Sequence, residues 1–122
     1  MTAETLISIV DDDTSLLNAL VRLVRSLGYK AQGFPSAEDF IASDIAQDCS
    51  CVITDIQMGG MSGIELAGVL SGQKPRVPVI VITARPDEGL EEAAMAQGAT
   101  CFLRKPVETN RLAQCLEHAI AA

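Results

Sequence analysis

Short apolar runs alternate with longer amphipathic segments along this chain. Five runs have the length and aliphatic content of buried strands, at about residues 5–10, 29–33, 51–54, 79–83 and 100–103. Apolar residues recur at helical spacing at about residues 15–27, 63–71, 88–97 and 108–121. Pro35-Ser36 opens a further helix after the second run. This alternation predicts an α/β fold with βαβ units, a parallel sheet and helices on both of its faces.

Local signals mark where several of these helices begin and end. Gly28 closes the first helix as a left-handed terminator, and the Ser62-x-x-Glu65 pattern is a capping box for the third. Asp87 and Gly98 bracket the fourth, an acidic and alanine-rich helix that should pack lightly. The first helix is expected to bury one stripe, made of Leu16, Leu20, Leu23, Val24 and Leu27.

Composition limits the kind of protein. The chain has 122 residues, which we interpret as a single domain over residues 1–122. It is 48% hydrophobic but only 3% aromatic, so the core must be aliphatic. The net charge of −7 disfavours nucleic acid and anionic membranes as direct partners. We see no membrane-span pattern and no secretory leader pattern, and therefore expect a cytoplasmic location.

The chain has four cysteines, of which Cys49 and Cys51 match no standard zinc spacing. Cys51 and Cys101 fall within predicted strands and are interpreted as small buried hydrophobes. Cys115 and His118 are spaced to share a helix face, so a metal-ligand pair there is a minor alternative. The simpler interpretation is a reduced cytoplasmic protein with ordinary thiols.

Polar residues gather at the ends of four predicted strands. Asp11-Asp12-Asp13 follows the first strand, Asp55 ends the third, Thr83 ends the fourth, and Lys105-Pro106 follows the fifth. Ligands of open α/β sheets bind at the carboxyl ends of strands, so these groups are expected to converge. Clustered carboxylates repel one another, which calls for a cation among them.

The chemistry of these residue types favours Mg²⁺ and a phosphoryl group. Mg²⁺ takes carboxylates, water and phosphate oxygens, and Asp12 and Asp55 supply two carboxylates, with Asp11 acting directly or through water. A helix N-terminus also favours acids, and Asp13-Thr14 fits such a cap, but three consecutive acids exceed that need. Lys105 would act as a point charge on phosphate, and the bond before Pro106 is a candidate for the cis form.

These residues resemble a known family. Val10-Asp11-Asp12, Asp55-Ile56-Gln57-Met58, Gly63, Thr83-Ala84 and Lys105-Pro106 occur in the order and spacing typical of the receiver domain of two-component response regulators. The resemblance covers about residues 5–121. It implies a flavodoxin-like (βα)5 three-layer sandwich with the strand order 2-1-3-4-5, for which a chemotaxis receiver is a standard example.

The resemblance also implies residue roles. Asp55 would be the phosphoacceptor, taking a phosphoryl group from the phosphohistidine of a histidine kinase or phosphotransfer protein. Asp11, Asp12, Asp55 and the main-chain carbonyl of Gln57 would bind Mg²⁺. Lys105 would contact the phosphoryl oxygens. The chain would then be a signalling domain whose only chemistry is self-phosphotransfer and autodephosphorylation.

Two further residues would transmit the signal. Thr83 would hydrogen-bond the phosphate and move toward the site, and Phe102 matches the switch aromatic that repacks in response. A core role for Phe102 is an equally good interpretation. The face formed by the fourth helix, the fifth strand and the fifth helix would be the signalling surface.

Two features depart from the family pattern. The family usually has proline after the methionine of its phosphorylation loop, whereas this chain has Gly59-Gly60, which gives the loop more backbone freedom. Arg85-Pro86 follows Thr83-Ala84, and Pro86 would stiffen a loop that moves in other members. Gln57 and Arg85 occupy positions that resemble the family's modulators of phosphate lifetime.

Two other classes of function stay open at this point. Haloacid-dehalogenase-like phosphatases use an aspartate, a threonine and a lysine in the order of Asp11-x-Asp13, Thr83 and Lys105. That interpretation leaves Asp55 without a role and lacks the expected late acidic pair. The other alternative is an interaction module with the receiver fold that works without phosphorylation.

The resemblance extends in part to nitrogen-fixation-type regulators, which carry a helix-turn-helix output. A role in transcription control, an output domain or partner protein, and a phosphorylation-dependent homodimer are the expectations that follow. The cognate kinase and its stimulus are not encoded in any pattern of these residues.

Overall fold

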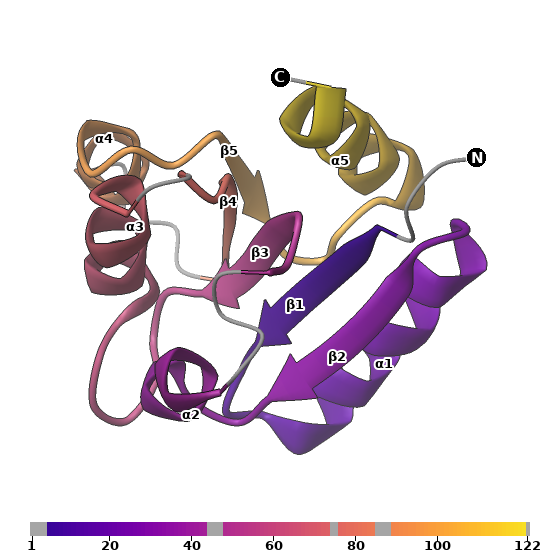
Figure 1. Ribbon diagram of the computed structural model, residues 1–122, viewed down its shortest axis with the longest axis horizontal. Helices are drawn as coiled ribbons and strands as arrows, with labels where there is room; N and C mark the ends of the chain where they lie inside the picture. Colours follow the sequence, from indigo (N-terminus) through magenta and orange to yellow (C-terminus); the bar gives the residue numbers. More distant parts are fainter. Residues whose placement is uncertain (1–4, 44–47, 74–75, 85–88, 122) are drawn as a thin grey trace.

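Five parallel strands form one sheet at the centre of the protein (Figure 1). The computed structural model describes residues 5–43, 48–73, 76–84 and 89–121. Its strands are β1 (Leu6–Val10), β2 (Lys30–Phe34), β3 (Cys51–Asp55), β4 (Val79–Thr83) and β5 (Cys101–Arg104). They pair in the order β2-β1-β3-β4-β5, which confirms the expected flavodoxin-like topology.

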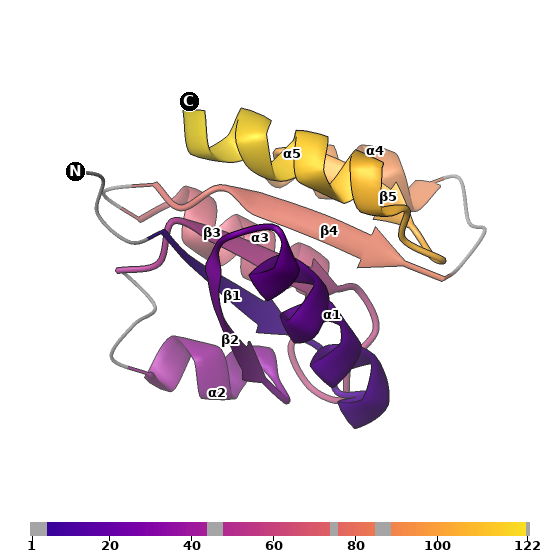
Figure 2. The same cartoon turned by 90° about the vertical axis from the view of Figure 1, so that its right-hand side faces the viewer.

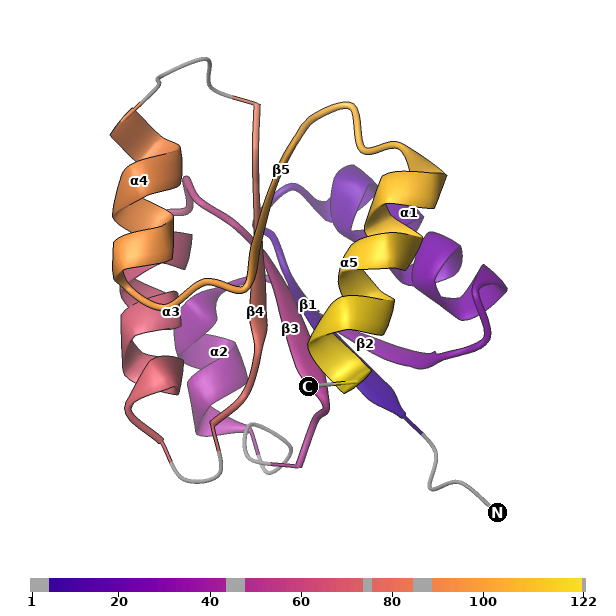
Figure 3. The ribbon, with the colours of Figure 1, turned by 90° about the horizontal axis from the view of Figure 1, so that it is seen from above.

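Helices cover both faces of the sheet and make a three-layer arrangement (Figure 3). They are α1 (Thr14–Ser26), α2 (Ala37–Ala42), α3 (Gly63–Ser71), α4 (Gly89–Ala96) and α5 (Thr109–Ala121). Helices α1 and α5 lie on one face, and α2, α3 and α4 lie on the other. Of the helices in the described part of the chain, none is both long and apolar enough to span a membrane.

Alternating side chains of the central strands supply two aliphatic cores. Ile7, Ile9 and Ile53 pack on the side of α1 and α5, whereas Val10 and Val52 pack on the opposite side. All five side chains are fully buried, and burial of one such side chain contributes roughly 1.5–3 kcal/mol. Because both faces are covered, these strands are continuous apolar runs rather than alternating ones.

The two edge strands differ from the central three. In β2 the exposed residues Lys30 and Gln32 alternate with buried Ala31, and β5 ends in exposed Arg104. β2 runs to Phe34 rather than ending at Gly33 as expected, because Phe34 pairs in register with Val10 and its side chain is buried. Among the described strand residues, the exposed ones therefore lie only in the two outer strands.

The predicted helix ends are largely confirmed. Asp13 is the N-cap of α1 and accepts a hydrogen bond from the Leu16 amide, and the reciprocal capping box of Ser62 and Glu65 starts α3. Gly28 and Gly98 adopt φ values of 99° and 102°, the left-handed region that favours glycine after a helix. The proposed cap Asp87 lies outside the described residues.

The prediction of which α1 residues are buried was wrong in one respect. Leu17, Leu20 and Val24 are the buried residues of this helix, whereas Leu16 and Leu23 are only partly covered at the edge of the core. Leu17 packs against Gly33 of β2, where an added Cβ would crowd its branched end at 3.0–3.3 Å. The centre of the buried face is therefore shifted toward Leu17, while Leu20 and Val24 are buried as expected.

The cysteine interpretation holds for Cys51, which is fully buried, and burial raises the pKa of its thiol. Cys101 lies in a strand as expected but is half-buried; burial, followed by its contact with Cys115, raises the pKa of its thiol to about 12. His118 is exposed on α5. Among the described residues, the one group of three or more possible metal ligands is acidic and does not include Cys115 or His118.

Candidate functional site

The carboxyl ends of four parallel strands meet at one edge of the sheet. Asp11 directly follows β1, Asp55 is the last residue of β3, Thr83 ends β4, and Lys105 follows β5. Figure 2 shows the arrows of β1 and β4 pointing toward the same end of the molecule. The pairing of Asp55 with Ile82 keeps the ends of β3 and β4 nearly level, so their terminal side chains share one rim.

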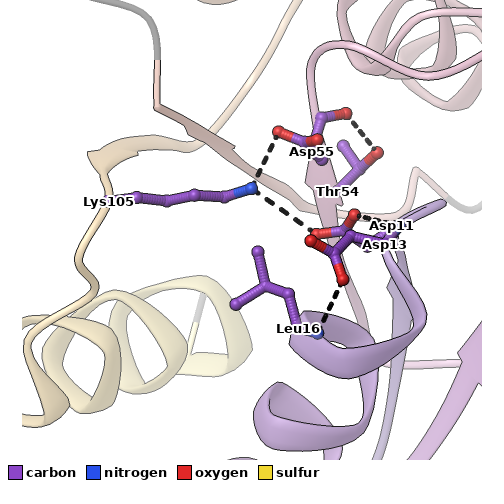
Figure 4. A network of polar contacts seen from close by, with 6 residues as sticks. All are labelled: Asp11, Asp13, Leu16, Thr54, Asp55 and Lys105. Carbon is purple, nitrogen blue, oxygen red and sulfur yellow. Dashed lines mark hydrogen bonds and ion pairs between the residues drawn. The ribbon is translucent and has the colours of Figure 1, made fainter.

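Lys105 forms ion pairs with two of these carboxylates (Figure 4). Its Nζ lies 3.4 Å from Oδ1 of Asp55 and 3.6 Å from Oδ2 of Asp11. The side chains of Lys105, Asp55 and Asp11 are 18%, 12% and 1% exposed, so the contacts are shielded from bulk solvent. The Lys105–Pro106 peptide bond is cis, as the sequence suggested. The expected convergence of a lysine with the acidic cluster is therefore present.

Asp11 is a buried acid whose two carboxylate oxygens differ in their hydrogen bonding. Its Oδ1 accepts a hydrogen bond of 2.9 Å from the Asp13 amide, whereas Oδ2 has no hydrogen-bond partner in the described part of the chain and faces Lys105. Burial raises the pKa of Asp11, and the Asp13 amide and Lys105 offset that rise only in part. A buried carboxylate oxygen in this state favours a cation as its partner.

Asp55 has the same electrostatic character but is more accessible. Burial raises its pKa, while the charge of Lys105 is the largest opposing effect. Lys105 thus favours the ionised carboxylate, which is the form that acts as a nucleophile. Since Asp55 is partly exposed at the rim, a reacting group can approach it from solvent.

Three carboxylates make a group that suits a hard divalent cation. One oxygen from each of Asp11, Asp12 and Asp55 lies within 4.8 Å of the others. Mg²⁺ prefers such oxygen ligands and commonly keeps waters and a phosphate oxygen in its remaining positions. This donor set, in which Oδ2 of Asp11 makes no hydrogen bond to the described residues, therefore fits Mg²⁺.

The loop between β3 and α3 forms the open side of the group. The Gly59 amide donates a 3.3 Å hydrogen bond to Oδ2 of Asp12, and exposed Gln57 lies in the same loop. Gly63 at the start of α3 lies directly against the main chain of Asp55, where an added Cβ would collide with the Asp55 carbonyl oxygen. Glycine at position 63 thus lets α3 begin immediately beside the proposed acceptor.

The two expected switch residues lie on the next two strands. Thr83 is 1% exposed at the end of β4. Phe102 of β5 is half-buried against the core under α3 and α4, and its ring centroid is 5.4 Å from the guanidinium carbon of Arg104. A pocket of about 450 Å³ opens beside Phe102 and Lys105 and includes Arg111 of α5. Arg85-Pro86 lies outside the described residues.

Comparison with known protein families assigns the chain to one of them. The family model of the response regulator receiver domain matches residues 7–117. The chain belongs to the response regulator receiver domain family. Membership in this family decides against the haloacid-dehalogenase-like alternative.

Curated relatives of this chain include proteins named as transcriptional regulatory proteins and response regulator proteins. The transcriptional regulatory protein FixJ of Bradyrhizobium diazoefficiens is 34% identical over 120 residues, covering 98% of this chain and 58% of FixJ. The response regulator protein TmoT of Ectopseudomonas mendocina is 36% identical over 118 residues, covering 96% of this chain and 53% of TmoT. The chain thus spans about half the length of the curated relatives it matches.

Solved structures agree with the fold. The crystal structure of FixJ-N superposes with a TM-score of 0.87 at 32% identity, covering 98% of this chain and 96% of that chain. A response regulator receiver protein from Burkholderia phymatum superposes with a TM-score of 0.84 at 37% identity, covering 97% and 96%. The receiver fold therefore extends over nearly the whole chain.

Sequence reasoning found the charged residues of the site but missed one neighbour. Glu38 of α2 accepts a 2.8 Å hydrogen bond from the Met61 amide in the loop after β3. The two residues are 23 positions apart, so no local pattern predicts the contact. The unusual Gly59-Gly60 pair was the available signal, since glycines mark close approaches of the backbone to other groups.

Proposed function

We propose that Asp55 accepts a phosphoryl group from the phosphohistidine of a histidine kinase or phosphotransfer protein, in a Mg²⁺-dependent reaction. The observation that carries the proposal is the partly exposed Asp55 carboxylate, 3.4 Å from the Lys105 ammonium and grouped with Asp11 and Asp12. A nucleophile, a fixed cation and a hard-metal donor set are the parts that phosphoryl transfer to an acid requires.

Each residue has a defined task in that reaction. An ionised oxygen of Asp55 attacks phosphorus, the bond from phosphorus to the donor histidine nitrogen breaks, and an acyl phosphate forms on Asp55. Lys105 keeps Asp55 ionised beforehand and then faces the new phosphoryl oxygens. Asp11, Asp12, Asp55 and the Gln57 carbonyl would hold Mg²⁺, which neutralises charge on the transferring group when bound.

The signal would pass from the phosphoryl group to β4 and β5. The Thr83 hydroxyl is proposed to hydrogen-bond a phosphoryl oxygen, and Phe102 is proposed to repack as Thr83 moves. Phe102 and Thr83 lie on adjacent paired strands, and the pocket beside the ring leaves space for repacking. The face of α4, β5 and α5 would then change its affinity for a partner or for a second copy of the chain.

The cellular setting is proposed by similarity. The relatives include proteins named as transcriptional regulatory proteins, and this chain corresponds to about half of each. We therefore propose a cytoplasmic receiver, over residues 1–122, that controls a transcriptional output domain or partner. With a net charge of −7, this domain itself is a poor candidate for contact with DNA.

The central test is a mass spectrum of the intact protein after treatment with acetyl phosphate, with and without Mg²⁺. We expect one added phosphate on Asp55 in the presence of Mg²⁺ and at least about a hundredfold slower labelling in its absence, since a metal supplies several kcal/mol to such steps. Asp55→Asn should abolish the adduct. Asp48→Asn, a matched change at an exposed acid, should leave it intact.

The outcomes separate the alternatives. A phosphate that persists in Asp55→Asn would move the acceptor to another residue. No labelling of the wild-type protein, with no calorimetric signal for Mg²⁺, would favour the interaction module that works without phosphorylation. Labelling that needs no Mg²⁺ would show that the acidic group has another purpose.

A further inference from the structure

The loop after β3 contains two consecutive glycines that play different structural roles. Gly60 adopts a φ of 97°, in the left-handed region, whereas Gly59 does not. An added Cβ on Gly59 would meet open space. An added Cβ on Gly60 would lie 2.5 Å from Oε2 of Glu38. The backbone at Gly60 therefore lies directly against a side chain of helix α2.

The same Glu38 oxygen holds the loop through a main-chain hydrogen bond. The Met61 amide donates to Oε2 of Glu38 over 2.8 Å. This bond lowers the pKa of Glu38, as expected when an amide stabilises the ionised carboxylate. A carboxylate acceptor makes the bond stronger than one between neutral groups. Gly60 permits the close approach that the bond requires.

The other end of the segment is held by the acidic group. Gly59 donates its amide to Oδ2 of Asp12, so residues 59–61 are fixed between Asp12 on one side and Glu38 on the other. Gln57, whose carbonyl is a proposed Mg²⁺ ligand, lies between Asp55 and this fixed segment. The position of that carbonyl thus depends on where residues 59–61 are held.

We propose that Glu38 is a positioning residue for the Mg²⁺ site, acting through the loop at residues 57–61. The inference rests on the proposed function. Two consecutive glycines raise the entropy cost of ordering a free loop. If the Gln57 carbonyl had to be ordered only when Mg²⁺ binds, this cost would weaken the affinity for Mg²⁺. The Glu38 contact provides that order before the ion arrives.

The test compares three variants of exposed acids in one helical turn. Glu38→Ala removes the acceptor, Glu38→Gln removes the charge but keeps an acceptor oxygen, and Asp39→Ala removes an equal charge from the adjacent position. Isothermal titration calorimetry with Mg²⁺ alone gives the dissociation constant for each. We expect Glu38→Ala to weaken Mg²⁺ binding about three- to tenfold, the range of a modest hydrogen bond, and the other two to stay within about twofold.

A second measurement addresses the loop itself in the metal-free protein. Hydrogen exchange of the Met61 amide, followed by NMR, should accelerate about tenfold in Glu38→Ala and remain slow in Asp39→Ala, because only the former loses the acceptor. Labelling by acetyl phosphate provides a third. Glu38→Ala should require more Mg²⁺ for half-maximal labelling but reach the wild-type rate at saturation.

Specific results would overturn the inference. Equal weakening in Glu38→Gln and Glu38→Ala would assign the effect to charge alone, and wild-type affinity in Glu38→Ala would remove the role altogether. Failure of the proposed function is distinct from both, since it appears as an unlabelled wild-type protein. The exchange of the Met61 amide reports on the contact in either case.

Discussion

The acidic site has an inner and an outer half that are held by different forces. The inner half consists of Asp11, Asp55 and Lys105, all at most 18% exposed and all delivered by strand ends. The outer half consists of Asp12, Glu38 and residues 59–61, which lie mostly at the surface and are joined by main-chain hydrogen bonds. Charge balance dominates the first half, and backbone order dominates the second.

The difference indicates how the two halves respond to change. Loss of the inner cation Lys105 leaves two shielded carboxylates without their partner, and the cost falls on the stability of the fold. A lost contact in the outer half frees a loop, and the cost falls on ligand affinity. Removal of the inner cation and removal of an outer contact should therefore affect different measurements.

The largest expected effect comes from removing the inner cation. Lys105→Met should destabilise the metal-free protein by about 1–2 kcal/mol, because two shielded carboxylates lose their partner while partial exposure limits the penalty. Urea unfolding at neutral pH measures the change. Arg22→Met, at an exposed position of α1, is the control and should have almost no effect. An equal loss in both variants would contradict a special role for the inner half.

The next largest effect is expected for Asp11→Asn, which should change Mg²⁺ affinity without lowering the stability of the metal-free protein. Asp11→Asn keeps the oxygen that accepts from the Asp13 amide but removes a charge that burial disfavours. Metal-free stability should stay level or rise, while Mg²⁺ affinity should fall by at least about tenfold, as for the loss of an important metal-site group. Thermal unfolding and calorimetry check the two outcomes. A less stable variant would show that the ionised form holds the fold together.

A pair of glycine substitutions addresses the outer half. Gly60→Ala should cost about 1 kcal/mol, since its φ of 97° disfavours a side chain and the new Cβ would crowd Glu38. Gly59→Ala, one position earlier and facing open space, should be neutral or slightly stabilising. Unfolding free energies and Mg²⁺ titrations of both variants give the comparison. Indistinguishable variants would mean that the loop is not held against α2.

The smallest expected effect is a pH dependence of the metal-free protein. The pKa values of Asp11 and Asp55 are raised by burial, so the folded state binds protons more readily than the unfolded state. Their stability contribution is therefore complete below the ordinary value of about 3.9 and is lost as pH rises through the raised values. The unfolding free energy of the wild type should fall relative to that of the double variant Asp11→Asn/Asp55→Asn as pH rises from about 4 to 7. A wild-type unfolding free energy that rises relative to the variant over this pH range would contradict the prediction.

The inner half could be predicted from sequence because its chemistry is local to strand ends. Asp11, Asp55 and Lys105 each follow or end an apolar run, and parallel pairing brings such positions to one edge. The capping box at Ser62 and Glu65 also depends only on neighbouring residues, and it appears as expected. The roles of these residues in phosphoryl transfer stay predictions.

The sequence predicted Asp12 of the outer half, but not the contacts that hold this half together, because they depend on tertiary packing. The contact of Glu38 with Met61 joins α2 to a loop that follows another strand, and no periodicity encodes it. The burial of Leu17 in α1 has the same origin, since Gly33 of a neighbouring strand makes the space for it. Sequence patterns give the elements, whereas the fit between their surfaces sets such details.

The two outer strands of the sheet have a consequence for how copies of the protein meet in solution. Both β2 and β5 are short, and each carries an exposed cation, Lys30 at the start of one and Arg104 at the end of the other. Open strand margins are templates for uncontrolled stacking between molecules, and basic side chains counter this by mutual repulsion. Lys30 and Arg104 therefore oppose the joining of two copies through their edge strands.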